Sequence, residues 1–152
     1  MKTTAPMQLQ TDLRRHGRRV TDQRRLILEA VRGTDVHPMA EWVYRKVRRR
    51  LPRISLGTVY RNLKLLVAEG LIQELERAGF GRYDGNTTRH HHFTCQVCRH
   101  IFDLTVPVDR AFERRMASRM GLEISHHRIA FYGRCRACRA KERGRQRTRK
   151  PN

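Results

Sequence analysis

Residues 81–104 read GRYDGNTTRHHHFTCQVCRHIFDL, and this stretch decides how the second half of the chain is organised. It contains two aspartates, three consecutive histidines and two cysteines separated by two residues. Each of these residue types can bind a metal ion. A second pair with the same spacing, Cys135 and Cys138, follows near the C-terminus. The sequence therefore predicts metal chemistry in this stretch, and we expect it to control the basic, helix-rich half that lies upstream.

The two pairs account for every cysteine of the chain: Cys95, Cys98, Cys135 and Cys138. A two-residue spacer lets both thiolates of a pair approach one ion, and two pairs complete a tetrahedral zinc site. Four protein ligands leave no open position, so we expect this site to be structural. It would join the start of the second domain to its end. The alternatives are two redox dithiols or surface cysteines without a role.

The histidines predict a second, different site. Alternate side chains of an extended strand share a face, so His90 and His92 point one way and His91 the other. The candidate ligands are these two histidines, the flanking aspartates and a histidine far upstream: His37, Asp84, His90, His92 and Asp103. Such nitrogen and oxygen donors suit Fe(II), Mn(II), Co(II), Ni(II) or Zn(II), and affinity order alone does not choose among them.

The net charge of +20 favours a polyanionic partner, most simply nucleic acid. Residues 1–84 carry 18 basic against 9 acidic residues, and residues 135–152 carry 8 against 1. Solubility or an acidic membrane surface are the alternatives. The chain shows neither a signal peptide nor a run of apolar residues long enough to span a membrane. We therefore expect a cytoplasmic protein with reduced thiols and no membrane partner.

The upstream half predicts three helices and a hairpin, in the order of a winged helix-turn-helix. A loose arm over residues 1–10 and a short helix over residues 10–16 precede them. Thr21 and Ser55 are expected to cap the first and third helices. The predicted elements are a helix over 22–32, a helix opened by 37–38, a helix over 56–69, and strands over 71–77 and 82–84.

In a winged helix the helix capped by Ser55 would enter the major groove of DNA. Arginines and lysines near helix ends would contact phosphates, and three residues of this helix are candidates for base edges: Tyr60, Arg61 and Asn62. The full set of candidate DNA contacts is Arg19, Ser55, Thr58, Tyr60, Arg61, Asn62 and Lys64.

A second unit is predicted downstream, with strands over 91–94, 100–104 and 122–132 and a helix over 108–120. The expected organisation is a DNA-binding domain (1–84), a hinge (85–89), a dimerisation and metal-binding domain (90–141) and a basic disordered tail (142–152). The fold class is therefore α+β.

Several motifs together closely resemble the ferric uptake regulator superfamily over residues 10–142. They are GRRVTDQR from Gly17, HP from His37, SLGTVYRNL from Ser55, RYD from Arg82, HHHFTC from His90 and YGRC from Tyr132. The resemblance implies a homodimeric, metal-activated repressor with an N-terminal winged helix-turn-helix domain and a C-terminal α/β dimerisation domain with a four-cysteine zinc site. It also implies a palindromic double-stranded DNA operator, and a regulatory Fe(II) or Mn(II) site at His37, Asp84, His90, His92 and Asp103.

Within that superfamily, the aspartates at positions 84 and 103 make the chain resemble the peroxide-sensing branch, whereas iron-uptake regulators more often carry glutamates at the matching positions. The resemblance implies that Fe(II) reacts with hydrogen peroxide and that the oxidant modifies His37 or His90, which releases metal and DNA. Mn(II) would give a peroxide-resistant repressor. A third metal site of some members would need ligands at four positions, and we expect that site to be absent because two of them are arginines: Arg89, His91, Arg110 and His127.

Two alternatives stay open at this point. One is a regulator of the same superfamily that responds to iron, zinc or nickel sufficiency. The other is a metal-dependent nuclease, since an open metal position can activate water. A zinc deaminase would need a glutamate beside the histidines, which residues 89–93 lack. We expect a regulator and not an enzyme.

Overall fold

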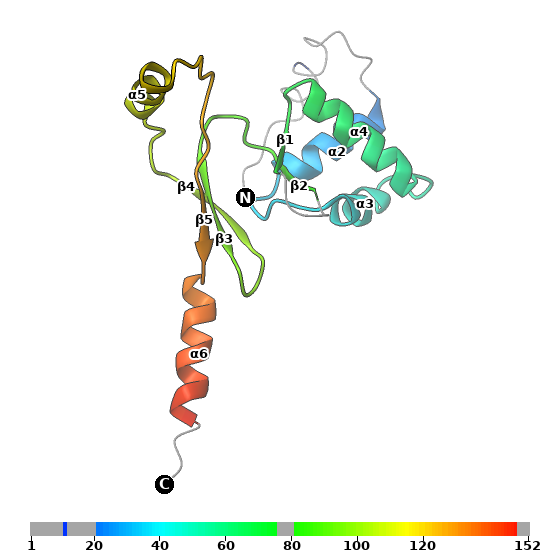
Figure 1. Ribbon diagram of the computed structural model, residues 1–152. Helices are drawn as coiled ribbons and strands as arrows, with labels where there is room; N and C mark the ends of the chain where they lie inside the picture. Colours follow the sequence, from blue (N-terminus) through cyan, green and yellow to red (C-terminus); the bar gives the residue numbers. More distant parts are fainter. Residues whose placement is uncertain (1–10, 12–20, 76–80, 149–152) are drawn as a thin grey trace. The chain divides into compact units, whose positions relative to one another are not determined.

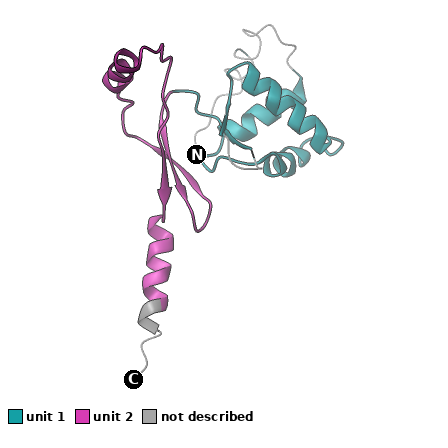
Figure 2. Ribbon diagram, viewed as in Figure 1, with its two compact units in different colours: residues 1–88 teal, residues 89–152 magenta. Residues whose placement is uncertain are grey.

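A computed structural model describes Thr11, residues 21–75 and residues 81–148 of the chain. The chain divides into two compact units, Met1–Thr88 and Arg89–Asn152 (Figure 2). The division falls inside residues 85–89, the segment predicted as a hinge. The arm predicted over residues 1–10, the helix predicted over 10–16 apart from Thr11, and the candidate DNA contact Arg19 lie outside the described residues.

The described part of the first unit contains three packed helices followed by an antiparallel hairpin (Figure 1). The elements are α2 (Asp22–Arg32), α3 (Ala40–Arg48), α4 (Leu56–Ala68), β1 (Gln73–Leu75) and β2 (Arg82–Asp84). In the hairpin, Gln73 pairs with Asp84. This order of elements is that of a winged helix-turn-helix.

Both predicted N-caps are confirmed. The Thr21 hydroxyl oxygen accepts a hydrogen bond from the Arg24 backbone N–H at 3.2 Å, and the Ser55 hydroxyl oxygen accepts one from the Thr58 N–H at 3.1 Å. The apolar faces of the helices meet in one core that includes the fully buried Ile27, Val43 and Leu63. This core fixes α4 against the other two helices.

The helix α3 begins later than the sequence predicts. Residues 37–38 are expected to open it, but α3 starts at Ala40 with Met39 as its N-cap. His37 has a left-handed backbone (φ 48°), and the Pro38 carbonyl accepts a hydrogen bond from the Tyr83 N–H at 3.0 Å. The segment before α3 is therefore attached to strand β2 and does not continue the helix.

The second unit is built on a three-stranded sheet in the order β4-β3-β5. β3 (His91–Cys95) is antiparallel to β4 (Ile101–Leu104) and parallel to β5 (Ala130–Gly133). Helix α5 (Arg110–Met120) lies between β4 and β5 in the chain, with Asp109 as its N-cap and the left-handed Gly121 (φ 63°) at its end. Helix α6 (Arg136–Thr148) follows β5 directly (Figure 1).

The last strand is much shorter than the predicted one over residues 122–132. Side chains bind the backbone of the preceding segment: Arg89 donates to the Ser125 carbonyl at 2.8 Å, and Glu113 accepts from the His127 N–H at 3.0 Å. The Ser125 carbonyl and the His127 N–H therefore bond to side chains and not to a neighbouring strand, so the strand does not extend over this segment.

The prediction of disorder from residue 142 is wrong up to Thr148, because α6 extends to that residue. Alanine, arginine, lysine, glutamate and glutamine dominate the segment, and all five have high helix propensity. High charge is typical of disordered segments, but these charged residues are also good helix formers.

The second unit buries few large apolar side chains. Among its described residues only Cys95 and Ile101 are buried hydrophobics, whereas Val97, Val106, Leu122 and Tyr132 are each more than half exposed. A unit of this size with so thin a core needs a metal, a partner surface or both.

Candidate metal centres and nucleic-acid surface

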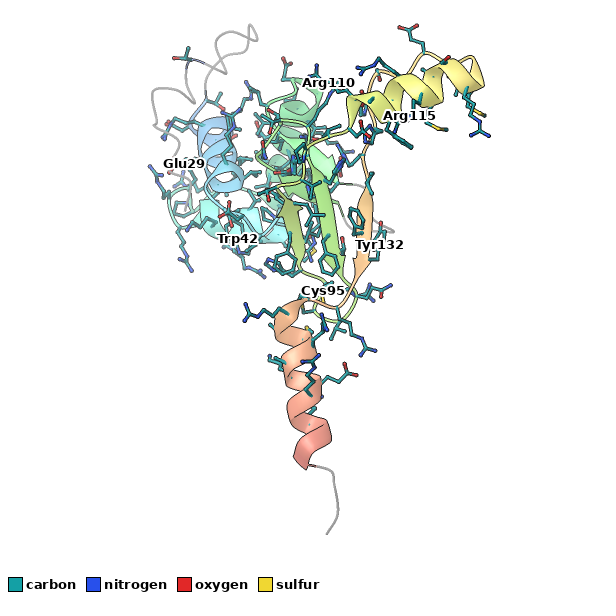
Figure 3. The ribbon with its side chains drawn as sticks, turned by 90° about the vertical axis from the view of Figure 1, so that its left-hand side faces the viewer. Glu29, Trp42, Cys95, Arg110, Arg115 and Tyr132 are labelled. Carbon is teal, nitrogen blue, oxygen red and sulfur yellow. The ribbon has the colours of Figure 1, made fainter. Side chains whose placement is uncertain are left out.

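The four cysteines converge at one end of the second unit. Cys95 is the last residue of β3, and the parallel pairing of Cys95 with Gly133 brings the end of β5 beside it. Cys135 and Cys138 therefore arrive next to the first pair, where α6 begins; Figure 3 shows Cys95 at this end of the sheet. The four sulfur atoms lie within 4.8 Å of one another, and none forms a disulfide.

The geometry of this cluster fits a tetrahedral metal ion. Sulfur atoms about 2.3 Å from one tetrahedral zinc ion are about 3.8 Å apart, and the Cys98 and Cys135 sulfurs are 3.9 Å apart. The backbone N–H groups of Cys98 and Cys135 point at the Cys95 sulfur and lower the pKa of that thiol to about 6. The Cys135 thiol raises the pKa of Cys138 to about 12. Adjacent thiols oppose one another's ionisation, and a bound cation would remove that conflict.

A second cluster lies on one face of the same sheet. His92 pairs with Asp103 across β3 and β4, and His90 lies just before β3. One oxygen of Asp103 is 3.2 Å from the His90 Nε2 atom and 3.5 Å from the His92 Nε2 atom. The two imidazole centroids are 4.4 Å apart. The predicted alternation is confirmed, because two histidines and one carboxylate meet on one face.

The other two predicted ligands meet in the first unit. The His37 Nε2 atom is 3.9 Å from an Asp84 carboxylate oxygen, and both side chains are buried. Two ligand atoms that each lie about 2.1 Å from one ion can be at most about 4.2 Å apart, so the separation of His37 and Asp84 is compatible with a shared ion. The His37 carbonyl accepts from the Arg82 guanidinium at 3.2 Å, and the Asp84 carboxylate accepts from the Asn86 N–H at 2.8 Å. Strand β2 therefore positions both groups.

The surface of α4 corrects one predicted DNA contact. The sequence predicts an accessible Asn62, but its side chain is buried and donates a hydrogen bond to the Thr58 carbonyl at 2.9 Å. Asn62 therefore supports the helix from inside. Arg61 and Lys64 are exposed, as is Tyr60. The Tyr60 hydroxyl donates to Glu41 at 2.7 Å, which raises the pKa of Tyr60 and lowers that of Glu41.

No described helix combines the length and apolar character needed to cross a membrane.

The model of the ferric uptake regulator family matches residues 15–132 of the chain. The chain belongs to the ferric uptake regulator family. The match covers the winged helix, the candidate ligands of the regulatory site (His37, Asp84, His90, His92 and Asp103) and the first cysteine pair.

Relatives of the chain include two peroxide regulators. The chain is 36% identical over 131 residues to the peroxide operon regulator of Bacillus subtilis, and the aligned region covers 86% of this chain and 90% of that protein. It is 34% identical over 130 residues to the peroxide-responsive repressor PerR of Staphylococcus aureus, and here the aligned region covers 85% of this chain and 88% of that protein. The fold matches that of the Helicobacter pylori ferric uptake regulator, with a TM-score of 0.75 at 20% identity over 91% of this chain and 97% of the other.

A third polar cluster occupies the opposite face of β3. It contains three of the four positions considered for a third metal site, Arg89, His91 and His127, and its carboxylate comes from Glu113, which the sequence analysis did not single out. Glu113 of α5 is buried and lies 2.9 Å from the His127 Nδ1 atom and 3.9 Å from the Arg89 guanidinium. The hydrogen bond from His127 lowers the pKa of Glu113. The His91 ring packs 5.6 Å from that of His127 and accepts from the Ile129 N–H at 3.4 Å. In this member of the ferric uptake regulator family, Arg89 places a cation beside that carboxylate. Spacing could not reveal Glu113, because it lies among exposed arginines of α5.

Proposed function

We propose that the chain is a metal-dependent transcriptional repressor that binds a palindromic DNA operator as a homodimer in the cytoplasm and senses hydrogen peroxide. The observation that carries this proposal is the donor set. One carboxylate, Asp103, serves both His90 and His92, while His37 and Asp84 are held together at a distance suited to a shared ion. Neutral nitrogens with carboxylate oxygens suit Fe(II) and Mn(II), whereas the thiolates suit Zn(II).

The four cysteines are proposed to hold a structural zinc ion. With four sulfur ligands the ion would have no position for substrate, so its duty is to hold β3, β5 and the start of α6 together. This role agrees with the thin apolar core of the second unit. Zinc would remain bound through every step of regulation.

The regulatory ion is proposed to be bound by all five predicted ligands: His37, Asp84, His90, His92 and Asp103. Two belong to the first unit and three to the second. Asp84 and His90 are six positions apart, a segment that spans at most about 20 Å. Binding one ion to both sets would therefore fix the orientation of the two units. If only that orientation suits the operator, metal binding and DNA binding are thermodynamically linked.

Peroxide sensing is proposed from the two aspartates and from the similarity to peroxide regulators. When bound, Fe(II) would supply the redox chemistry that activates hydrogen peroxide beside the imidazole ligands. In net terms, one oxygen atom of the peroxide would insert into a ring carbon–hydrogen bond of His37 or His90, which oxidises the ring by two electrons, and the other oxygen atom would leave as water. The modified imidazole would lose its ability to bind the ion. The buried environment of His37 keeps this chemistry away from bulk solvent.

The DNA interface is proposed to be the exposed face of α4, with Arg61, Lys64 and Tyr60 as contacts. A dimer would place two such helices about 34 Å apart, which matches the two halves of a palindrome. The exposed apolar side chains of the second unit, such as Leu122 and Tyr132, would be covered by the second copy.

A DNA titration with and without Mn(II) tests the coupling. The probe is a 30-base-pair duplex selected from a random pool by the Mn(II)-loaded protein, so that the protein itself chooses its binding sequence. We expect affinity to rise at least several-fold with Mn(II). Equal affinity in both conditions would refute the coupling, and cleavage of a plasmid by the metal-loaded protein would indicate a nuclease.

Mass spectrometry after peroxide treatment of the Fe(II) form tests the signal. A gain of one oxygen on the peptide that contains His37 or His90 is expected, with no gain in the Mn(II) form. An unmodified Fe(II) form that still binds DNA would indicate a regulator of metal sufficiency in its place.

A further inference from the structure

Helix α6 carries an arginine groove that no part of the proposed regulatory mechanism uses. Arg136, Arg139 and Arg143 are spaced at i, i+3 and i+7, so they lie on one face of the helix. Together with the small residues Ala140 and Gly144 they line a groove of about 480 Å³. Gly144 meets nothing within 4 Å of the position where a Cβ atom would stand, so the groove is open beside it.

The three arginines of this groove outnumber the acidic residues of their own helix. Glu142 is the one acidic residue of α6, and it pairs with Arg134. Among the residues that the structure describes, no carboxylate forms an ion pair with Arg136, Arg139 or Arg143. Like charges three and four positions apart repel one another and weaken a helix. A bound polyanion would relieve this repulsion.

The helix begins at the cysteine cluster. Cys138 belongs to the first turn of α6, and the backbone N–H of Cys135 points at the Cys95 sulfur at 3.3 Å. When the four sulfurs bind one ion, that ion holds the start of α6 against strand β3. The position of the arginine groove relative to the sheet is then fixed.

We propose that the arginine groove of α6 is a second DNA-binding surface, which contacts the phosphates of double-stranded DNA without reading its sequence. This inference rests on the proposed DNA-binding function and adds a contact outside the winged helix. Arg136 and Arg143 are seven residues apart, about 10 Å along the helix. One DNA strand presents a phosphate about every 3.4 Å along its axis. The groove therefore has room for two or three phosphate contacts.

An acidic membrane is a poorer match for this helix. A surface-bound amphipathic helix inserts leucine, phenylalanine or tryptophan into the lipid. The apolar residues of α6 are two alanines and Cys138, and none is large enough to anchor the helix. Its arginines alone would give electrostatic attraction without insertion.

The test compares two triple variants of the full-length, zinc-loaded chain with equal loss of charge. One is Arg136→Gln, Arg139→Gln and Arg143→Gln in α6. The matched control is Arg110→Gln, Arg114→Gln and Arg119→Gln, three exposed arginines of α5. Glutamine has a helix propensity similar to that of arginine, so both helices should form. Binding to the selected duplex with Mn(II) is measured from 50 to 200 mM salt.

The α6 variant is expected to reduce the slope of log affinity against log salt by about 0.9 per lost phosphate contact, or about 2 to 3 in total. The wild type would then lose about 10- to 40-fold more affinity over this salt range than the α6 variant. The α5 control should keep the wild-type slope. Equal slopes for the two triple variants would overturn the inference, because net charge alone would then explain any change.

The same titration separates this inference from the proposed function. An α6 variant with a wild-type slope but intact Mn(II) stimulation refutes only the second surface. A wild type without Mn(II) stimulation refutes the proposed function. Retention of the wild type on vesicles with one quarter phosphatidylglycerol, lost in the α6 variant while DNA binding is unchanged, would reassign the groove to membranes.

Discussion

The cysteine cluster and the histidine–aspartate set differ in where their ligands come from. All four cysteines belong to one unit, and sheet pairing brings them together. The five proposed regulatory ligands belong to two units joined by a short segment. His92 and Cys95, one from each set, are three positions apart in the same strand. Ligands from one unit favour permanent structure, whereas ligands from two units make the ion a link that can be released.

The largest expected effect is on the cysteine cluster. Cys135→Ser removes one of four zinc ligands. A structural zinc contributes about 10–16 kcal/mol, against about 5–15 kcal/mol for the whole stability of a domain. The variant should lose its zinc and the second unit should unfold, measured by metal content and by hydrogen exchange over residues 89–148. The exposed Thr105→Ser is the control. A variant that keeps one zinc and wild-type protection would contradict the structural role.

The next effect separates the two sets. Asp103→Asn replaces the carboxylate that lies beside both His90 and His92 with a neutral amide. We expect Mn(II) affinity to fall at least about 10- to 100-fold, the range found when groups that support metal ligands are removed. Zinc content should not change. The exposed Glu123→Gln serves as the control, and equal Mn(II) affinity in both variants would remove Asp103 from the site.

Two neighbouring histidines give a sharper comparison. His92→Ala should weaken Mn(II) binding as Asp103→Asn does, because its imidazole lies on the same face as Asp103. His91→Ala should leave Mn(II) affinity unchanged and reduce stability by about 1 kcal/mol or more, because the Ile129 N–H loses its acceptor. Isothermal titration with Mn(II) and urea unfolding measure the two effects. Loss of Mn(II) binding in both variants would contradict the division of the strand into two faces.

The smallest expected effect concerns Glu113. Its pKa is lowered by the hydrogen bond from His127, so the unfolded chain binds a proton more readily than the folded one does. The stabilisation from this contact is therefore present above the unfolded pKa, near 4.5, and lost as the pH falls through the lower folded value. Glu113→Gln should lower the unfolding midpoint at pH 7, and the difference from wild type should narrow towards pH 3. If the difference in unfolding midpoint between the variant and the wild type did not change with pH, the charge of the Glu113 carboxylate would not contribute to stability.

Much of the fold follows from local signals in the sequence. Thr21 and Ser55 have hydroxyls that can cap a helix, and the apolar spacing of residues 22–32 gives the helix its observed bounds. Strict alternation in a strand separates His91 from His90 and His92. The two-residue spacing lets both thiols of each cysteine pair approach one ion, which predicts the zinc site, and the parallel pairing of β3 with β5 brings the two pairs together.

The errors occur where distant contacts decide the structure. Asn62 is polar but its side chain is buried, because its amide donates a hydrogen bond to the Thr58 carbonyl oxygen. Residues 122–129 have strand-like composition, yet Arg89 and Glu113 bind their backbone. Residues 37–38 are held by strand β2, which is more than 40 positions away. Such contacts leave no periodic pattern in the sequence.

Linkage between Mn(II) and DNA is the central claim, and reciprocity tests it most directly. The measurement is Mn(II) affinity of the zinc-loaded chain with and without a saturating amount of the selected duplex. If the regulatory ion fixes the DNA-binding orientation, DNA must tighten Mn(II) binding by the same factor as Mn(II) tightens DNA binding, typically about 5- to 150-fold. An Mn(II) affinity that DNA does not change would contradict the account.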